Sequence, residues 1–453
     1  MLENIKKVHF VGIGGVGMSA IADVLWEKGY KVSGSDLNSS DIVTNLAQKG
    51  IKIYKNHAEE NIRDSDIVVI SSAISRDNPE VAAAIRQNIK VCHRSDILAA
   101  LLNSAKGIAV AGSHGKTTTS SMLSVVLDNA GIDPTVLIGG VVDYFHGNAR
   151  LGKSEYVIAE ADESDGSFLK FFPYIAVVTN IEDDHMDHYG TMENIIKAFD
   201  QFVGQVTEGG TAVLCLDHEN VRTIANCTKK NYISYAIDND ADYRAVNINM
   251  SKHRTAFDVI YKNDNIGHIE LNIPGRHNIL DALAAIAVCR FLGVSFAKIA
   301  AGFMLFHGAK RRFQTKKKNE NYWIVDDYGH HPTEIRTTLE AAKQTMPKRL
   351  ICIFQPHRYS RTKLLAREFG NCFKKADILI CTDIYPAGEK PLPGISGRTI
   401  LSEVEKNGQK AIYIEDMNKI AAYVKGIMKP GDLIITMGAG NIFLCGEQIA
   451  EMI

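Results

Sequence analysis

The feature that most constrains the fold is a short glycine loop between an apolar strand and a helix. Residues 107–112 read GIAVAG, the loop continues through GKT to Thr117, and a helix is expected over 117–130. Glycines let backbone N–H groups approach phosphate oxygens, and a helix N-terminus favours negative charge. The pattern predicts a phosphate-binding loop on a parallel α/β sheet, where Lys116 reaches the outer phosphates and Thr117 ligates magnesium.

This loop departs from the general GxxxxGK[ST] pattern, because Val110 stands where the first glycine would be. A glycine turn with an exposed lysine is the alternative interpretation. Strand, loop and helix together favour the phosphate loop. We therefore expect ATP to bind along Gly112, Ser113, His114, Gly115, Lys116, Thr117 and Thr118.

Carboxylates follow the next strand-like runs of this segment. Glu160 lies inside YVIAEAD, which ends in Asp162 and is followed by Glu163, and the run IAVVTN leads into EDDH, ending at His185. The carboxyl ends of parallel strands meet at the edge where ligands bind, and magnesium prefers oxygen ligands. A carboxylate within an apolar strand is unfavourable unless it is paired or metal-bound, which makes Glu160 a predicted metal ligand. His185 is equally compatible with a ligand and with a structural residue.

A second glycine loop lies near the N-terminus. Gly12, Gly14 and Gly17 form GxGxxG after the strand VHFVGIG, and Asp36 ends the second strand where a ribose-binding acid would lie. Taken alone, the motif indicates NAD. A UDP-sugar also places a diphosphate against a helix N-terminus, and a ligase acting on such a sugar would need two diphosphate sites.

Length and composition limit the classes of protein to which the chain can belong. A chain of 453 residues needs more than one core. Its net charge of -1 excludes a chain-wide attraction to nucleic acid or an anionic membrane. No run approaches the roughly 18 apolar residues of a membrane-spanning helix, the N-terminus does not resemble a signal peptide, and the cysteines form no CxxC pair. We expect a cytoplasmic α/β protein with reduced cysteines that enters no membrane and binds no nucleic acid.

The pattern of strands and helices predicts three segments. The first closes near residue 103, the second contains an antiparallel insertion over 243–273, and a lysine-rich surface turn is expected at 316–321, near the start of the third.

Nine motifs occur in order along nearly the whole chain: VGIGGVGMSAIA, AGSHGKTTT, EADESDGSF, TNIEDDHMDHY, GRHN, RRF, DDYGHHPTEI, FQPHRYSRT and DIYPAGEKP. In this order they resemble those of the Mur ligases, the amide-forming ligases of bacterial cell-wall synthesis. The resemblance implies a Rossmann-like domain for the UDP part of the substrate over 1–103. It further implies a central P-loop ATPase-like domain over 104–308 and a Rossmann-like domain for the amino acid over 309–453.

The resemblance also assigns roles to residues. Catalysis is implied for Lys116, Glu160, His185, Arg312 and Asp327. Magnesium binding is implied for Thr117, Glu160 and His185. Contacts to ATP are implied for the loop residues above and for Asn180, His277, Asn278, Arg312 and Asp327. Contacts to the sugar nucleotide or the amino acid are implied for Gly12, Gly14, Gly15, Gly17, Met18, Ser19, Asp36, Ser72, His330, His357, Arg358 and Arg361.

The implied reaction joins L-alanine to the carboxylate of UDP-N-acetylmuramate, with ATP and magnesium, through an acyl phosphate. EDDHMD and DIYPAGEKP resemble the alanine-adding branch, which also implies no modified lysine, because Asp200 lies near the family's carbamylated position and Lys197 is out of register. The base that deprotonates the amine stays open among His185, His330 and His331. We expect small-molecule partners and a monomer or homodimer.

Three alternatives are compatible with parts of the sequence. A recycling ligase would attach a preformed peptide to the same sugar. An NAD-dependent oxidoreductase would use the first glycine loop and leaves GSHGKTTT and GRHN unexplained. A catalytically inactive nucleotide-binding regulator is disfavoured because no matched catalytic position is substituted.

Overall fold

The computed structural model describes residues 2, 4–251 and 254–453. The chain divides into two compact units, one comprising Met1–Val246, Asp258–Ile269 and Leu280–Phe306, the other comprising Asn247–Phe257, Glu270–Ile279 and His307–Ile453. The described residues form three sheets flanked by helices, of 5, 10 and 6 strands, which confirms the three-domain α/β fold.

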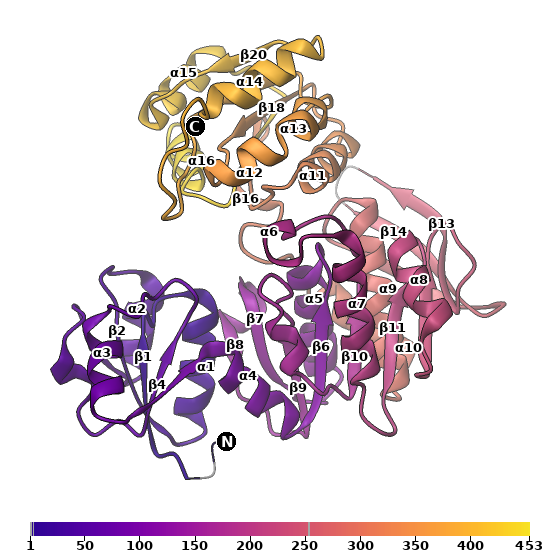
Figure 1. Cartoon of the computed structure of the whole chain (residues 1–453). Coiled ribbons are helices and arrows are strands. Elements are labelled where there is room, and N and C mark those ends of the chain that lie inside the picture. Colours follow the sequence, from indigo (N-terminus) through magenta and orange to yellow (C-terminus); the bar gives the residue numbers. More distant parts are fainter. Residues whose placement is uncertain (1, 3, 252–253) are drawn as a thin grey trace. The chain divides into compact units, whose positions relative to one another are not determined.

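The first sheet is parallel throughout and has the strand order β3-β2-β1-β4-β5 (Figure 1). This is the order of a Rossmann-like sheet, so the predicted class of the N-terminal domain is confirmed. Its strands are β1 (Lys7–Val11), β2 (Lys31–Ser35), β3 (Lys52–Tyr54), β4 (Ile67–Ile70) and β5 (Lys90–His93). Its helices are α1 (Val16–Glu27), α2 (Asp41–Gln48), α3 (Pro79–Arg86) and α4 (Arg94–Asn103).

The central sheet has the order β15-β14-β13-β12-β11-β10-β6-β9-β7-β8. Its strands are β6 (Lys106–Ala111), β7 (Thr135–Val142), β8 (Gly147–Arg150), β9 (Tyr156–Glu160), β10 (Ile175–Val178), β11 (Thr211–Cys215), β12 (Tyr232–Ala236), β13 (Tyr243–Met250), β14 (Thr255–Tyr261) and β15 (Asp264–Leu271). Strand β6 pairs in parallel with both β9 and β10. The carboxyl ends of all three strands therefore meet at one edge.

The expected insertion is present as β13, β14 and β15. Two residues separate β14 from β15, and such a connection joins antiparallel strands. The helices of this part of the chain are α5 (Lys116–Asn129), α6 (Met186–Tyr189), α7 (Met192–Gly204), α8 (Glu219–Cys227), α9 (Arg276–Phe291) and α10 (Phe296–Met304). Figure 1 shows α5 lying along β6, the strand that leads into the glycine loop.

The third sheet has the order β16-β17-β21-β18-β19-β20, and its strands are parallel except for β16 at the edge. Its strands are β16 (Gln314–Lys318), β17 (Tyr322–Asp327), β18 (Arg349–Phe354), β19 (Ile378–Cys381), β20 (Ala411–Tyr413) and β21 (Asp432–Met437). The predicted turn over 316–321 was partly wrong. Lys316, Lys317 and Lys318 extend an edge strand because its backbone pairs with β17, and the turn begins at Asn319.

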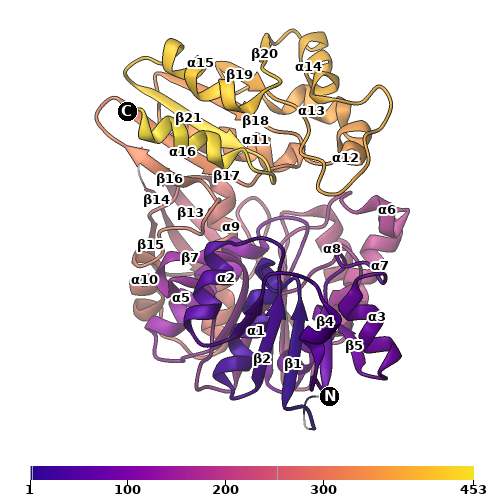
Figure 2. The ribbon, with the colours of Figure 1, turned by 90° about the vertical axis from the view of Figure 1, so that its left-hand side faces the viewer.

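Helices cover both faces of the third sheet (Figure 2). They are α11 (Pro332–Gln344), α12 (Tyr359–Leu364), α13 (Ala366–Cys372), α14 (Gly397–Lys406), α15 (Ile420–Ile427) and α16 (Phe443–Glu451). Successive side chains of a strand point to opposite faces. In β18, Cys352 and Phe354 join the core that includes Leu339 of α11, whereas Ile351 and Ile353 join the core of α15 and α16. Within the described residues, no helix is both long and apolar enough to cross a membrane.

Candidate active site

The predicted phosphate loop connects β6 directly to α5. Gly112 has φ +138° and Gly115 has φ +85°, and both angles favour glycine. A Cβ on Gly112 would overlap the hydroxyl of Thr179, and one on Gly115 would lie 2.6 Å from Asp281 Oδ1. The loop therefore requires glycine at both positions for backbone angle and for space.

Residues that follow β10 hold this loop in place. The backbone N–H of His114 donates to Asn180 Oδ1 at 2.8 Å, and Asn180 Nδ2 donates back to the carbonyl of His114 at 2.9 Å. Thr179 Oγ1 donates to the same carbonyl at 2.6 Å. Asn180 was predicted to lie near ATP, whereas Thr179 was not predicted. Both side chains act here as a brace for the loop backbone.

Lys116 is folded back against its own loop. Its ammonium donates to the carbonyl of Gly112, to that of Ser113 at 3.3 Å and to Glu163 Oε1 at 2.7 Å. Burial acts against the charged form, but the negative charges of Glu163, Asp162 and Glu160 outweigh it and raise the pKa of Lys116. The lysine is therefore a permanent cation at the mouth of the loop.

Glu160 and Thr117 lie together, as the metal prediction requires. Thr117 Oγ1 donates to Glu160 Oε2 at 3.1 Å, and the backbone N–H of Gly139 donates to Glu160 Oε1 at 2.6 Å. Ser120 Oγ donates to the same oxygen at 3.4 Å. Gly139 was not predicted, although a Gly-Gly pair inside the apolar run TVLIGGVV is a sequence signal for close approach of another group.

His185 lies at the start of α6 with φ +59°, in the left-handed region that few residues other than glycine adopt. Its Nε2 atom lies 3.8 Å from Glu163 Oε1 and 3.5 Å from Asp184 Oδ2. The structure thus places His185 among carboxylates, in the same unit as Glu160 and Thr117. Lys197, the lysine considered for modification, is exposed and pairs with Glu193 on the surface of α7.

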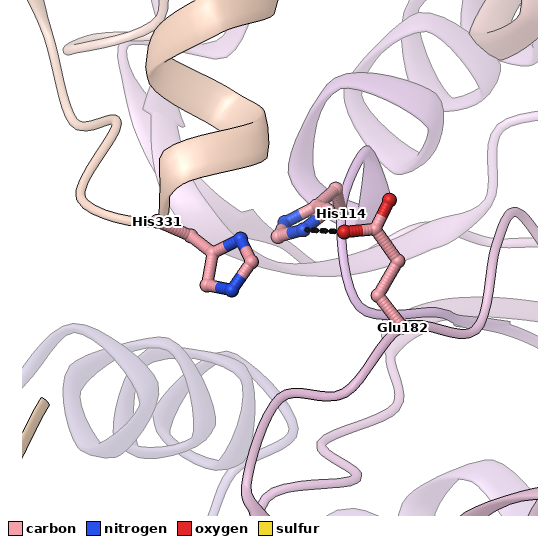
Figure 3. Close-up of side chains that lie close together, drawn as sticks. All are labelled: His114, Glu182 and His331. Atoms are coloured by element: carbon pink, nitrogen blue, oxygen red, sulfur yellow. Dashed lines mark hydrogen bonds and ion pairs between the residues drawn. The ribbon is translucent and has the colours of Figure 1, made fainter. Parts of the chain in front are cut away.

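His114 extends from the loop toward the segment after β10. Its Nε2 atom lies 3.3 Å from Glu182 Oε2, as Figure 3 shows. The backbone N–H of Glu182 donates to Ser113 Oγ at 2.8 Å. Glu182 therefore fixes two side chains of the loop, those of Ser113 and His114.

The donor atoms behind the loop fit a divalent cation. The hydroxyl of Thr117 and the carboxylate of Glu160 are hard oxygen ligands, and His185 can add a nitrogen. Glu163 Oε2 is buried and has no hydrogen-bond partner among the described residues. A buried carboxylate oxygen without a donor is unfavourable unless a cation reaches it. The residues at this edge therefore fit magnesium.

The N-terminal glycine loop has the geometry expected for a diphosphate site. Gly12 has φ +76°, and the backbone N–H of Gly14 donates to Asp36 Oδ2 at 2.9 Å. Gly15 precedes the first residue of α1, whose backbone N–H groups face the loop. Met18 and Ser19 are buried within α1. The backbone N–H of Ser19 donates to the carbonyl of Gly15 at 2.8 Å, and its hydroxyl donates to the carbonyl of Val16 at 2.9 Å, so in this structure Ser19 serves the helix itself.

Arg94 was not predicted, yet it connects the two glycine loops. Its Nη2 donates to Asp162 Oδ2 at 2.6 Å, and a Cβ on Gly17 would lie 3.1 Å from its Nη1. Burial raises the pKa of Asp162, but the Ser164 hydrogen bonds and the charge of Arg94 outweigh it and lower the pKa overall. Ser72, a predicted contact, has its hydroxyl 3.1 Å from His93 Nε2. No local sequence pattern identifies Arg94, because its partners lie far along the chain.

The predicted adenine contacts belong to the second unit. Asn278 is buried at the start of α9, and its Nδ2 donates to the carbonyl of Pro274 at 2.6 Å. Gly275 has φ +113°, and a Cβ there would lie 2.5 Å from His277 Cε1. Burial and the nearby charge of Arg312 lower the pKa of His277 to about 4. His277 is therefore neutral at pH 7.

Asp327 and Arg312 lie together at the end of β17. Asp327 accepts the backbone N–H of Phe313 at Oδ2 and that of Gly329 at Oδ1, both at 2.8 Å. Burial raises the pKa of Asp327, while Arg312 and these N–H groups act in the opposite direction. Arg312 lies 3.7 Å from Glu334 Oε1. Asp327 thus organises the backbone that presents Arg312.

The predicted amino-acid contacts form one cluster in the second unit. The ring of His357 stacks on that of Tyr385, with centroids 5.8 Å apart, and Arg361 Nη1 lies 3.3 Å from His357 Nδ1. The ring of His330 meets that of His357 in an edge-to-face arrangement, with centroids 5.8 Å apart. Burial, then the charges of His330 and Arg361, lower the pKa of His357 to about 3. Arg358, with φ +71°, begins the turn into α12.

Three protein-family models match consecutive parts of the chain. The Mur ligase family catalytic domain matches residues 7–106, the Mur ligase middle domain matches 110–289, and the Mur ligase glutamate ligase domain matches 311–440. Their limits lie close to the boundaries between the three sheets.

Relatives and solved structures are similar over the full length. UDP-N-acetylmuramate--L-alanine ligase of Geotalea uraniireducens is 51% identical over 452 residues, covering 100% of this chain and 99% of the relative. The crystal structure of UDP-N-acetylmuramate-alanine ligase from Thermotoga maritima matches with a TM-score of 0.84 and 28% identity, covering 98% of each chain. A murein peptide ligase from Psychrobacter arcticus matches with a TM-score of 0.73 and 25% identity, also covering 98% of each chain.

Proposed function

Because the chain belongs to the Mur ligase family, we propose that it is an ATP-dependent carbon–nitrogen ligase that joins L-alanine to the carboxylate of UDP-N-acetylmuramate. The products are UDP-N-acetylmuramoyl-L-alanine, ADP and phosphate, and the step belongs to peptidoglycan precursor synthesis. About half of the residues are identical to those of relatives named for this reaction.

One observation in the structure carries the proposal. A single unit holds two glycine loops that each end at a helix N-terminus. The guanidinium of Arg94 lies beside Gly17 of the first loop, where a Cβ would come within 3.1 Å of Nη1, and donates to Asp162 beside the second. A ligase that activates a nucleotide sugar with ATP needs two phosphate sites within one folded unit. An NAD-dependent oxidoreductase would leave the loop of Lys116 without a role.

The chemistry requires activation, because the oxygen of a carboxylate is a poor leaving group. The lactyl carboxylate of the sugar attacks the γ-phosphorus of ATP, the bond to the β-phosphate oxygen breaks, and an acyl phosphate and ADP result. Lys116 supplies fixed positive charge at the loop, and Arg312 supplies a second cation. The amine of L-alanine then attacks the acyl carbon, loses its proton, and phosphate leaves.

Magnesium, when bound, lowers the negative charge that repels the attacking carboxylate from the phosphates. Thr117, Glu160 and His185 are the residues that would hold it. The brace from Thr179 and Asn180 holds the loop backbone in place before ATP arrives, so that only the side chain of Lys116, which is folded back onto the loop, has to turn toward the phosphates.

The amino-acid site is proposed for the cluster of His357, Arg358 and Arg361. Because the pKa of His357 is about 3, its ring is neutral at pH 7 and Arg361 is the cation that can bind the carboxylate of L-alanine. His330, His331 and His185 remain candidates for accepting the proton of the amine. Eight free cysteines, seven of them buried, support function in the reducing cytoplasm.

Phosphate release by the purified protein tests the reaction. UDP-N-acetylmuramate, ATP and magnesium are supplied with L-alanine, with glycine, with L-serine or with the murein tripeptide. We expect release with L-alanine and a product whose mass equals the sugar nucleotide plus alanine minus water. Release with the tripeptide and none with L-alanine would instead identify a recycling ligase.

A further inference from the structure

The loop after β19 supplies two side chains to the proposed amino-acid site. This site comprises His357, Arg358 and Arg361, which follow the neighbouring strand β18. Because β18 and β19 are parallel, the segments that leave their carboxyl ends lie at one edge of the sheet. The topology therefore brings Tyr385 and Glu389 of this loop to the site.

Tyr385 is paired with His357 through both backbone and ring. The backbone N–H of Tyr385 donates to the carbonyl of Pro356 at 2.8 Å, and that of Arg358 donates to the carbonyl of Tyr385 at 2.9 Å. These two bonds make Tyr385 and His357 direct neighbours on parallel segments. Their rings are nearly parallel, with an interplanar angle of 10°. The Tyr385 ring therefore limits how far the His357 ring can rotate.

Gly440, in the loop after β21, lies against the ring of Tyr385. A Cβ on Gly440 would come within 2.6 Å of Tyr385 Cγ and would overlap Gln355 Oε1, so the backbone and the ring are in close contact. Gly440 is held in turn by Arg311, whose Nη1 donates to its carbonyl at 3.1 Å. Tyr385 therefore rests on a fixed backbone and cannot shift toward it.

The orientation of the His357 ring matters for Arg361. His357 Nδ1 lies 3.3 Å from Arg361 Nη1. A guanidinium can only donate, so Nδ1 is the acceptor and the proton of the neutral ring is on Nε2. If the His357 ring rotated, this contact would be lost and Arg361 would lose one of its restraints. Tyr385 therefore acts on Arg361 through His357.

Glu389 holds the start of α12, the helix that carries Arg361. Within the described part of the chain, the side chain of its N-cap residue, Arg358, makes no capping hydrogen bond. Glu389 accepts the backbone N–H of Ser360 at Oε2, at 3.0 Å, and the Ser360 hydroxyl at Oε1, at 2.5 Å. A carboxylate at a helix N-terminus satisfies exposed N–H groups and interacts favourably with the helix dipole. A residue of another loop therefore supplies the cap of α12.

A tight turn directs Glu389 toward α12. The backbone N–H of Glu389 donates to the carbonyl of Pro386 at 3.0 Å. The two residues between them, Ala387 and Gly388, have φ angles of +49° and +86°. The left-handed conformation is unfavourable for alanine and persists only where surrounding contacts require it. The hydrogen bonds from Ser360 to Glu389 are such contacts.

We propose that Tyr385 and Glu389 are positioning residues of the amino-acid site, Tyr385 through the ring of His357 and Glu389 through the first turn of α12. Together they set the place where Arg361 presents its guanidinium to the carboxylate of the amino acid. Neither residue needs to contact the amino acid for this role. The inference rests on the proposed function, which makes the amino acid the substrate that binds Arg361.

Steady-state phosphate release tests the role of Glu389 when one substrate is varied at a time. The full-length protein is compared as wild type, as Glu389→Ala and as Glu405→Ala, where Glu405 is an exposed residue of α14 in the same unit. We expect Glu389→Ala to raise KM for L-alanine about tenfold, the size of effect that the loss of a helix cap can have. KM for ATP and for UDP-N-acetylmuramate should not change. Glu405→Ala should leave all three KM values unchanged.

Replacing Tyr385 tests the second contact and does not depend on the folding of Glu389→Ala. Tyr385→Leu removes the ring that lies along His357, so we expect KM for L-alanine to rise about fivefold. KM for ATP and for UDP-N-acetylmuramate should again stay the same. Tyr385→Phe keeps the ring and should restore most of the affinity for L-alanine that Tyr385→Leu loses.

Combining Glu389→Ala with Arg361→Gln shows whether Glu389 acts through Arg361. If it does, the double variant should have the same KM for L-alanine as Arg361→Gln alone, because the group that Glu389 positions is already absent. Two effects that add in full would overturn the role of Glu389.

The other outcomes are distinct. A wild-type KM for L-alanine in both Glu389→Ala and Tyr385→Leu would overturn the inference and leave the ligase proposal intact. An equal rise of all three KM values would also overturn it, because the change would then affect the whole unit and not the amino-acid site. Wild type that releases phosphate with no amino acid would overturn the proposed function and this inference together.

Discussion

Thr117 Oγ1 donates a hydrogen bond of 3.1 Å to Glu160 Oε2, joining the first turn of α5 to the end of β9. The partner oxygen, Glu160 Oε1, is held by the backbone N–H of Gly139 at 2.6 Å. Two hard ligands are therefore already adjacent before any metal binds. This arrangement lowers the entropy that must be lost when the ion is captured.

Replacing Thr117 by valine keeps the shape of the side chain and removes the hydroxyl. We expect kcat to fall by roughly 10²-fold, because one metal ligand is lost at the site of charge stabilisation. The measurement is phosphate release over a range of magnesium concentrations, where the half-saturating concentration should rise. The control is Ser124→Ala, which should retain normal turnover. It removes a hydroxyl of the same helix that donates only to the backbone carbonyl of Ser120.

Replacing Asp327 by asparagine tests whether this residue acts through the backbone that carries Arg312. The carboxylate of Asp327 accepts two backbone N–H groups, one on each oxygen, whereas an amide has a single acceptor oxygen. The backbone N–H of either Phe313 or Gly329 would therefore lose its acceptor, at a cost of about 1–3 kcal/mol. We expect a lower unfolding temperature together with a lower kcat. The control is Asp416→Asn in the same unit. Asp416 caps an exposed 3-10 helix, where asparagine caps equally well, so this change should alter neither the unfolding temperature nor kcat. Normal kcat in Asp327→Asn would refute the positioning role.

The sequence predicted those parts of the site that depend on local order. The strand, glycine loop and helix around Lys116 are consecutive, and their backbone requirements are visible in the residue types. Glu160 was found for a similar reason, since a carboxylate inside an apolar strand needs a partner. The parallel pairing of the first sheet also followed from alternating strands and helices.

The parts that escaped prediction depend on residues far apart in the chain. Arg94 meets Asp162 across 68 positions, and the Thr179 hydroxyl meets the loop across 65. The lysines of β16 were predicted to form a turn because a run of charged residues usually indicates a solvent-exposed loop. Their extended backbone conformation is instead determined by pairing with β17. Spacing within one sequence carries no information on such pairings.

Arg361 provides a test of the amino-acid site. Replacing it by glutamine removes the guanidinium beside His357 Nδ1. A charge-assisted hydrogen bond contributes about 1.5–3 kcal/mol, so we expect KM for L-alanine to rise roughly 10- to 100-fold while KM for ATP changes little. Arg367→Gln, an exposed position on α13, is the control. An equal rise in both KM values would show that Arg361 acts on the whole unit instead.

The environment of Glu80 allows a prediction of how the stability of the N-terminal domain changes at acidic pH. Its side chain is 0% exposed; Ser35 Oγ donates to it at 2.5 Å, Asn61 Nδ2 donates to it at 2.6 Å, and His57 lies 3.2 Å away. Burial favours the neutral acid, but His9, 3.5 Å away, and the hydrogen bonds of Ser35 and Asn61 outweigh it and lower the pKa of Glu80 to about 2, from 4.5.

The folded domain therefore holds Glu80 ionised at pH values where the unfolded chain would protonate it. The stabilisation is complete above pH 4.5 and is lost as the pH falls from 4.5 toward 2, by an amount on the order of 3 kcal/mol. We expect Glu80→Gln to lower the unfolding midpoint at pH 7 and to flatten its dependence on pH below 4.5, measured by urea titration followed by circular dichroism. Glu59→Gln removes a surface pair with Arg86 and should leave that dependence nearly unchanged. If Glu80→Gln kept the full pH dependence below 4.5, other carboxylates would be responsible for the acid sensitivity.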